Sequence, residues 1–512
     1  MFDGDFDLIV IGGGIMGACV AREASARRMR VVLFEQDDLA GGTSSRTSKL
    51  VHGGLRYLEH GAFGLVAESA RERATWLRVA PHLVRPLPFL FPIYRGARPA
   101  WMVRLGMTLY DALAWFRNVE SHRMLSAEQT LALEPALRGD GLLGSARFYD
   151  AQMDDARLCL ETALTARADG ATLETRARID GLVRQGDRIA GVRLGAREVR
   201  GRVVVNASGP WLDRVCDMAD GPTRPIRKTR GSHLIVPGML KGHALALSAH
   251  RDGRTFFALP WRGMTLIGTT DLDYQGDPAA VTCTAEERTY LLDETRRVFP
   301  AAGIGTGAVI AEFAGVRPLV YAEGVSASQV SRGDLIIESA DGLISIAGGK
   351  FTTARAVAER VVNRVAERLT PAEFPSSRTA RTPLVGGRPV SREEDAEWSM
   401  RAKGLGLDDA QTTALRETYG ARFGALLNLA AERGPGGGLH AQLPWIGVQV
   451  DFAVEHELAR TLEDVLRRRL PIALGPYRRD PALCDAVADR MARLLGWTPD
   501  DRREHVRRYL GA

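Results

Sequence analysis

The sequence predicts a mixed α/β (α+β) protein of more than one domain, and three observations carry this prediction. Residues 6–35 read as strand, glycine-rich turn, helix and strand. Apolar strands that end in glycine turns return at 203–211 and 343–350, so one layer of the fold is built from separate parts of the chain. Beyond residue 390 the apolar residues recur with helical spacing, which predicts a domain of α-helices.

The N-terminal unit has the pattern of a Rossmann-like dinucleotide site. A buried strand (6–12) and a strand at 31–35 flank a helix at 15–29, and the turn before that helix reads Gly12-Gly-Gly-Ile-Met-Gly17. Glycines there allow a tight turn and close approach of a pyrophosphate, and the helix N-terminus adds partial positive charge. Glu35 ends the second strand, where its carboxylate can accept the ribose hydroxyls. We expect cofactor contacts from Gly12, Gly13, Gly14, Gly17 and Glu35.

The later elements complete this layer and add a second one. A helix is expected at 155–168, twisted strands at 173–205, and a further helix at 352–368. Strands with one helix near 285–298 predict a second sheet, which would lie on the substrate side. The predicted division is a first region 1–370, with its nucleotide layer at about 1–90, 150–230 and 335–370 and its substrate sheet at about 90–150 and 231–334, then a linker 371–389 and a helical domain 390–512.

Composition excludes several classes of protein. The net charge of +6 is spread along 512 residues without a basic tail, which is typical of a charge-mixed surface, and no nucleic acid is expected. Five distant cysteines favour a reducing cytosol over disulfides or zinc, and no metal site is expected. The acidic N-terminus and the lack of an apolar run of ~18 residues predict a cytoplasmic protein, or one bound to the membrane from that side.

Five short stretches make the prediction specific. Thr47-Ser-Lys-Leu-Val-His-Gly-Gly-Leu-Arg-Tyr-Leu-Glu59 is followed by Asn206-Ala-Ser-Gly-Pro-Trp211, Gly268-Thr-Thr-Asp271, Gly315-Val-Arg-Pro-Leu319 and Gly348-Gly-Lys-Phe-Thr-Thr353. In the C-terminal part, 454–469 adds a further match. In this order the stretches resemble the FAD-dependent (aerobic, quinone-linked) glycerol-3-phosphate dehydrogenases over nearly the whole chain. The resemblance implies a Rossmann-like FAD-binding domain, an interleaved β-sheet substrate domain and a C-terminal α-helical cap domain.

The resemblance also implies the reaction. The enzyme would oxidise sn-glycerol 3-phosphate to dihydroxyacetone phosphate in glycerol and glycerophospholipid metabolism, passing a hydride from C2 to the flavin N5 and electrons to a membrane quinone. Such a reaction requires a phosphate clamp, a base for the C2 hydroxyl and a stabiliser of the developing alkoxide. Two alternatives stay open, namely an oxygen-reducing glycerol-3-phosphate oxidase and a flavin-binding protein without catalysis.

Substrate contacts follow from the matching motifs. Guanidinium forks suit a phosphate, so the predicted clamp is Arg56 and Arg332 with the hydroxyl of Tyr57, although Gly333 departs from the family pattern after the second arginine. Only five of the 68 basic residues are lysines, so Lys350 stands out as a compact charge near the substrate or the flavin pyrimidine. Thr270 completes the predicted substrate contacts.

The catalytic residues are predicted from residue chemistry and from the same motifs. The ordinary pKa of histidine, about 6.5, makes His52 the natural base. His233 is a second candidate, and the sequence does not choose between the two. Arg317 has too high a pKa for a base and is assigned to the alkoxide. Gly53 and Gly54 are expected to give the flavin ring room. Further predicted cofactor contacts are Thr43, Ser44, Ser45, Ser48, Lys49, Ala207, Gly209, Gly348, Gly349, Thr352 and Thr353.

Residues 94–117 predict an amphipathic helix. The apolar residues Trp101, Leu105, Leu109, Ala112 and Phe116 recur at helical spacing between four arginines. This pattern fits a helix that lies in a membrane interface, and equally a helix packed on the core. A membrane surface would bring the enzyme to its quinone; a homodimer is a further possibility.

Overall fold

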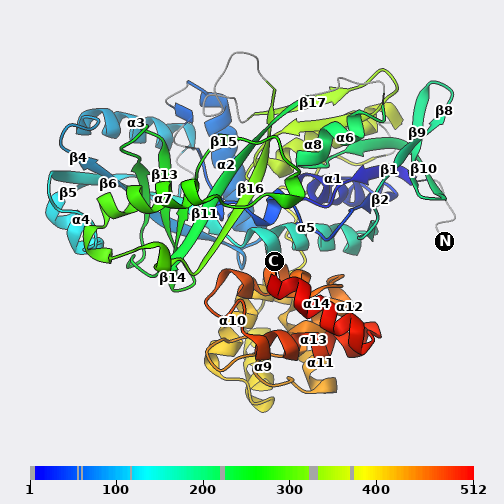
Figure 1. The fold of residues 1–512 in the computed structure, drawn as a ribbon. Helices are drawn as coiled ribbons and strands as arrows, with labels where there is room; N and C mark the ends of the chain where they lie inside the picture. The colour runs from blue at the N-terminus through cyan, green and yellow to red at the C-terminus, as the bar shows by residue number, and fades with distance from the viewer. Residues whose placement is uncertain are drawn as a thin grey trace.

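The computed structural model describes residues 6–54, 57–58, 61–115, 118–219, 225–321, 333–369 and 374–511. The predicted residues Arg56, Phe116 and Arg332 lie outside this part of the chain. Figure 1 shows a body of two sheets with helices around them, below which the C-terminal helices form a separate lobe. The predicted mixed α/β class is confirmed.

The first sheet corresponds to the predicted nucleotide-binding layer. Its order is β17-β18-β10-β1-β2-β7, and the strands from β18 to β7 are parallel. The strands are β1 (Phe6–Ile11), β2 (Val31–Phe34), β7 (Thr172–Glu174), β10 (Arg197–Asn206), β17 (Asp334–Glu338) and β18 (Ile344–Gly348), with the hairpin of β8 (Gly181–Gln185) and β9 (Arg188–Leu194) joined to β10. Parallel strands from distant parts of the chain therefore end at one edge of the sheet.

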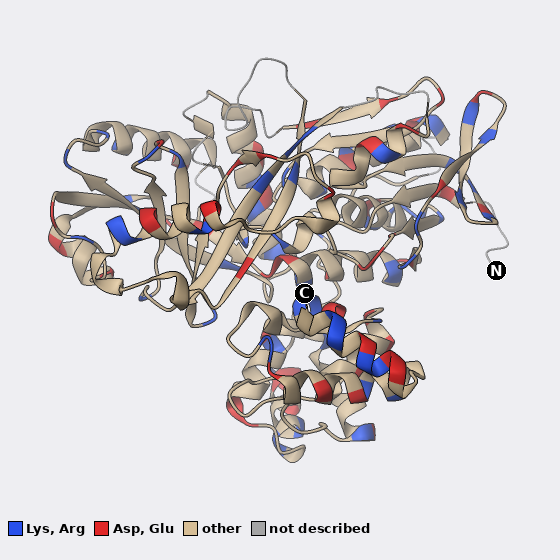
Figure 2. Cartoon of the chain, in the orientation of Figure 1, with Lys and Arg blue, Asp and Glu red and all other residues tan. Residues whose placement is uncertain are grey.

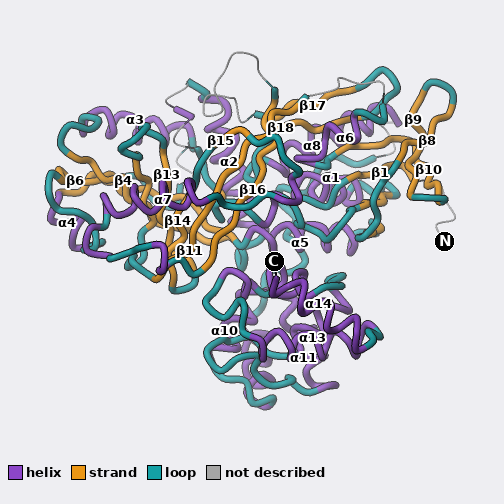
Figure 3. The backbone as a smooth tube through the Cα atoms, in the orientation of Figure 1, coloured by secondary structure: helices purple, strands orange, loops and turns teal. Residues whose placement is uncertain are grey.

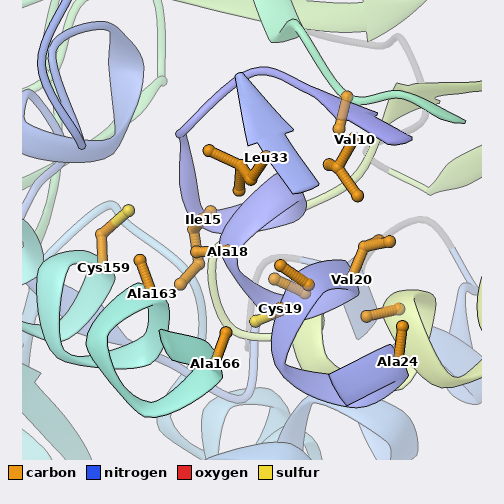
Figure 4. Close-up of a cluster of buried hydrophobic side chains, with 14 of the residues drawn as sticks. Val10, Ile15, Ala18, Cys19, Val20, Ala24, Leu33, Cys159, Ala163 and Ala166 are labelled. Carbon is orange, nitrogen blue, oxygen red and sulfur yellow. The ribbon is translucent and has the colours of Figure 1, made fainter. Parts of the chain in front are cut away.

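Small side chains let two helices pack closely beside this sheet. Helix α1 (Ile15–Ala26) lies between α5 (Asp155–Ala168) and α8 (Ala354–Leu369). Figure 4 shows Ala163 and Ala166 of α5 facing Ala18 and Cys19 of α1. All four side chains are fully or almost fully buried, and this packing holds the N-terminus of α1 rigidly over the sheet edge.

The second sheet forms the other half of the body. Its main order is β15-β11-β14-β13-β12-β4-β6-β3, with β16 beside β11 and β5 beside β6. The strands are β3 (Leu50–Val51), β4 (Val84–Tyr94), β5 (Arg123–Ser126), β6 (Leu142–Met153), β11 (Ile226–Pro237), β12 (Ala244–Ser248), β13 (Thr255–Trp261), β14 (Met264–Gly268), β15 (Leu272–Asp273) and β16 (Ala311–Val320). The remaining body helices are α2 (Phe63–Val79), α3 (Ala100–Leu113), α4 (Ala127–Leu133), α6 (Leu212–Cys216) and α7 (Ala285–Val298).

The C-terminal lobe consists of helices and loops, as the tube in Figure 3 makes plain. Its helices are α9 (Arg392–Gly404), α10 (Asp409–Tyr419), α11 (Phe423–Arg433), α12 (Val448–His456), α13 (Pro481–Leu495) and α14 (Pro499–Gly511), and a single π-helical turn, η9 (Asp464–Arg469), precedes α13. Two hydrophobic clusters lie wholly within this lobe. It therefore has a core of its own.

The described part of the predicted linker packs on the body. Arg22 of α1 donates to the carbonyl oxygens of Thr379 (3.1 Å) and Thr382 (2.5 Å), and Leu384 is buried in the cluster around α1. These contacts tie the chain between the two parts to the nucleotide layer. The domain boundaries themselves stay a prediction.

The cysteines, the apolar helices and the charged residues bear on the expectations drawn from composition. All five cysteines are buried and free of disulfides. Within the described ranges, no helix has the length and apolar character needed to cross a bilayer, and no cluster of residues could hold a metal ion. Basic and acidic residues are intermixed along both parts of the molecule (Figure 2).

Candidate active site

The carboxyl ends of the parallel strands surround a cavity of about 250 Å³. The turns after β1, β2, β10 and β18 all reach it, as expected for a nucleotide site at the edge of a parallel sheet. Predicted cofactor residues on its walls are Gly12, Gly14, Glu35, Thr43, Ser44, Ala207, Gly209, Gly348 and Gly349. The structure thus brings together residues from four distant segments.

Two glycines of the G-x-G-x-x-G turn are required by close approach. Gly12 has φ +110°, and a Cβ there would lie 2.7 Å from the carbonyl oxygen of Ala207. A Cβ on Gly17 would overlap the carbonyl oxygen of Gly12. The turn therefore has its tight path only with glycine at both positions.

Glu35 lines this cavity beside the glycine turn. Its carboxylate accepts the backbone N–H of Gly13 (2.6 Å) and of Asp37 (2.8 Å). Burial raises the pKa of Glu35 to about 7, against the effect of these two hydrogen bonds. The carboxylate is fixed beside the glycine turn, where it fits the ribose of a dinucleotide.

A second cavity of about 240 Å³ adjoins the first. Seven residues line both, namely Thr43, Arg46, Thr47, Pro318, Gly349, Lys350 and Phe351. Predicted residues on the walls of the second cavity include His52, Tyr57, His233, Arg317, Lys350, Ser48 and Thr352. The histidines, the arginine and the lysine predicted for catalysis and substrate binding therefore face one space.

His233 on β11 is held tightly. Its ring stacks on Phe313 with centroids 4.8 Å apart, and its Nε2 lies 2.8 Å from the Oγ of Ser48. A Cβ on Gly268 would overlap the ring, so glycine is needed on the neighbouring strand. Burial, with the charges of Arg317 and Lys49, holds the pKa of His233 well below its usual value, and the ring is neutral.

His52 lines the same cavity and follows β3 in the chain. It is half-buried, and its backbone N–H donates to the Oγ1 of Thr352 (3.3 Å). Its ring stacks with Tyr57 at a centroid distance of 6.3 Å. Lys350 lies over the ring of Tyr57, with Nζ 4.0 Å from the ring centroid. It also donates a hydrogen bond to the Oγ of Ser69 (2.8 Å). Lys350 thus reaches the cavity as a positioned point charge.

Arg317 on β16 is fixed by polar groups of the Gly268–Asp271 turn. It donates to the Oδ1 of Asp271 (3.1 Å) and to the Oγ1 of Thr269 (2.8 Å). Gly231 on the paired strand leaves room for the guanidinium, because a Cβ there would overlap it. The orientation of Arg317 is therefore set before any ligand binds.

Some predicted residues lie behind the cavity walls. These are Gly13, Gly17, Ser45, Lys49, Thr270 and Thr353. Lys49 forms a buried ion pair with Asp155 (2.5 Å) and donates to the carbonyl oxygen of Ser45, and Thr270 donates to Glu287 (2.6 Å). In this structure these two side chains support the site from behind, without a direct place on its surface.

Gly53 and Gly54 lie against two tyrosine side chains. A Cβ on Gly53 would overlap the hydroxyl of Tyr110, and one on Gly54 would overlap the ring of Tyr57. Gly54 also has φ +79°. Both glycines therefore make room for these tyrosines, and the clearance expected for a flavin ring stays a prediction.

The sequence analysis missed two arginines on the walls, Arg46 and Arg254. The Nε of Arg46 is enclosed and has no acceptor within the described residues, and burial lowers the pKa of this side chain to about 10. Arg46 lines both cavities, so an anionic cofactor group fits beside it. The donors, the glycine turn and Glu35 together fit a dinucleotide.

Comparisons with known proteins give this arrangement a family. A model described as FAD dependent oxidoreductase matches residues 7–364, and one described as the C-terminal domain of alpha-glycerophosphate oxidase matches residues 377–502. The chain is 38% identical to a glycerol-3-phosphate dehydrogenase of Synechocystis sp., with 98% of this chain and 95% of that protein covered. An aerobic glycerol-3-phosphate dehydrogenase of Staphylococcus aureus is 34% identical, with 97% and 92% covered.

A solved structure agrees with these relatives. The glycerol-3-phosphate dehydrogenase from Bacillus halodurans, complexed with FAD, has a TM-score of 0.80 and 30% identity, and the match covers 99% of this chain and 94% of that one. Both parts of the present chain are therefore included in the similarity. The chain belongs to the FAD-dependent oxidoreductase family and, within it, to the glycerol-3-phosphate dehydrogenases.

Proposed function

We propose that this enzyme oxidises sn-glycerol 3-phosphate to dihydroxyacetone phosphate and passes the electrons to a membrane quinone. The observation that carries the proposal is the second cavity, in which two histidines, Arg317 and Lys350 face a space that adjoins the FAD cavity. The names of the relatives support the same substrate. Bound FAD supplies the acceptor for the hydride that leaves C2.

The charges of the second cavity favour an anionic substrate. Four basic residues line the cavity, Arg46, Arg254, Arg317 and Lys350, together with two acidic residues, Asp150 and Asp271. Of the basic residues, Arg254 pairs with Asp252 (3.3 Å). Asp150 already accepts hydrogen bonds from buried Arg73 and from the hydroxyl of Tyr110, and Asp271 accepts one from Arg317. Positive charge therefore remains for the phosphate, and Arg56 and Arg332 stay our prediction for its clamp.

His52 is the better of the two candidate bases. A base must accept the proton of the C2 hydroxyl, and His233 resists protonation because it is buried beside two cations. We assign His233 to holding the hydroxyl of Ser48 and the shape of the cavity. Arg317, fixed by Asp271 and Thr269, donates to the substrate oxygen as it develops negative charge.

Helix α3 supplies the proposed membrane surface. Trp101, Leu105 and Leu109 are exposed on one face, at 65%, 62% and 38%, whereas Val103 and Met107 pack into the body on the other. Arg95 and Arg104 are exposed nearby, where they can reach lipid phosphates. The core-packed alternative accounts for one face only, so the exposed face supports an interfacial helix.

A second candidate function is the oxygen-reducing glycerol-3-phosphate oxidase. It is favoured by the description of the model that matches residues 377–502, which names alpha-glycerophosphate oxidase. Turnover of glycerol 3-phosphate should be measured in detergent with a soluble quinone analogue and, separately, with dioxygen alone. We expect turnover with the quinone analogue to be much faster than turnover with dioxygen. If peroxide forms in step with substrate loss, and as fast as the quinone analogue is reduced, the oxidase would be favoured.

A further inference from the structure

The C-terminal lobe meets the body at the loop that follows Glu35. Asp38 in this loop is almost completely buried, and both of its carboxylate oxygens are taken by arginines of η9. Arg468 donates through Nε to Oδ2 of Asp38 (2.5 Å), and Arg469 donates to Oδ2 and, at 2.9 Å, to Oδ1. A carboxylate enclosed by two guanidinium groups has one orientation open to it.

This loop packs directly on the glycine turn of the cofactor cavity. The N–H of Ala40 donates to the carbonyl oxygen of Gly13 (3.0 Å), and the N–H of Gly41 donates to that of Asp38 (2.8 Å). Leu39 is buried, and a Cβ on Gly13 would lie 2.8 Å from its Cδ2. A movement of Asp38 would therefore be passed to Gly13 through its chain neighbours Leu39 and Ala40.

A second contact of the lobe reaches Arg176, which lies beside Asp37 and the backbone of Glu35. Arg176 donates to the carboxylate of Asp464 on η9 (2.7 Å) and to Asp37 (2.8 Å). Its backbone N–H donates to the carbonyl oxygen of Asp37, and the N–H of Ala177 donates to that of Glu35 (2.8 Å). The π-helical turn thus contacts two segments that adjoin Glu35, namely the loop at Asp38 and the segment at Arg176.

The geometry of η9 suits this role. Asp464 accepts the backbone N–H groups of Arg460 (2.8 Å) and Thr461 (3.0 Å) and pairs with Arg468 (2.5 Å). The arginines around it hold the pKa of Asp464 well below its usual range, so it stays ionised. Single π-helical turns are uncommon and often occur at functional sites, and here the turn places two adjacent arginines on one carboxylate.

We propose that the C-terminal lobe is a positioning device for FAD, in which Arg468 and Arg469 hold Asp38, and Arg176 holds Asp37, so that Glu35 and the glycine turn keep the geometry that retains the cofactor. Docking of the lobe has other supports, because Arg157 of α5 forms a buried pair with Glu457 (2.7 Å). Loss of one arm of the device should therefore loosen the cofactor site while the lobe stays docked.

The matched variants are Arg469→Lys and Arg490→Lys. Arg490 also forms a two-pronged pair, with Asp451 (2.9 and 2.7 Å), but both residues belong to the lobe and neither contacts the loop. Lysine keeps the charge and loses the fork in each variant. Arg176→Ala is a milder third variant at a side chain that is 35% exposed, so it tests the device even if Arg469→Lys does not fold.

The measurement is the rate at which holoenzyme releases FAD after dilution, followed by flavin fluorescence, with apoprotein thermal unfolding alongside. We expect Arg469→Lys to raise the release rate about tenfold and Arg176→Ala by a few fold. Arg490→Lys should release FAD at the wild-type rate even where its unfolding temperature falls equally. Wild-type release from Arg469→Lys and Arg176→Ala, or equal acceleration by Arg490→Lys, overturns the proposal. Neither outcome depends on the substrate or acceptor.

Discussion

The two histidines of the second cavity differ in burial. His233 is buried and its pKa is held well below the ordinary value, whereas half-buried His52 is our proposed base. We expect His52→Asn to abolish the acid limb of the pH profile of kcat/KM for glycerol 3-phosphate. His233→Asn should keep that limb at reduced activity, because the limb is assigned to His52. Profiles from about pH 5 to 9 check this, and a limb that survives in His52→Asn and vanishes in His233→Asn contradicts it.

The same pKa shift has a consequence for stability. Because the folded pKa of His233 lies below its unfolded value, the unfolded chain binds that proton more readily, and stability falls as pH drops below about 6.5. His233→Asn should flatten this dependence in urea unfolding below neutral pH. An unchanged slope between the variant and the wild type would count against a neutral, buried His233.

Single residues were predictable from sequence only where their type was unusual. Lys350 stood out because lysine is rare in this chain, and the structure places it on the cavity wall. Lys49 is predicted as a cofactor contact, but the structure places it in a buried pair with Asp155. Arg46 and Arg254 were missed, because nothing in the local sequence separates a wall arginine from the many on the surface.

At the scale of elements, α3 carries the prediction on membrane binding. Trp101→Gln with Leu105→Gln should weaken binding to anionic lipid vesicles by more than about tenfold, since each buried apolar side chain contributes about 1.5–3 kcal/mol. Met400→Gln in α9 is the control, because Met400 is as exposed (69%) and lies in the C-terminal lobe. Cosedimentation with vesicles measures the effect. Equal binding of the double variant and the wild type would leave the exposed face of α3 without this role.

Periodicity predicted most elements well. The predicted helices at 155–168 and 285–298 agree with α5 and α7, and the strand–helix–strand unit agrees within a few residues. The predicted helix over 94–117 begins only at Ala100, because Tyr94 still belongs to β4 and Pro99 precedes the first turn. Apolar spacing alone did not separate the end of a strand from the start of a helix.

At the scale of the whole molecule, the relation between the two parts was beyond the sequence. Asp38 and Arg469 lie far apart in the chain, and charged residues that pair across an interface have no pattern of their own. Glycine turns predicted the convergence of β1, β10 and β18, because parallel strands end at one edge. The Asp38–Arg469 pair depends on how the two parts dock, whereas the convergence of the strands follows from local rules. Only the convergence of the strands was therefore predictable.

The central claim is that the adjoining cavities bring glycerol 3-phosphate to FAD in one molecule. Anaerobic titration of the holoenzyme with sn-glycerol 3-phosphate, followed by the visible absorption of oxidised flavin, tests it most directly. We predict complete bleaching by this substrate and an unchanged spectrum with glycerol, which lacks the phosphate that the basic cavity requires. A flavin that stays oxidised in excess glycerol 3-phosphate would contradict the claim.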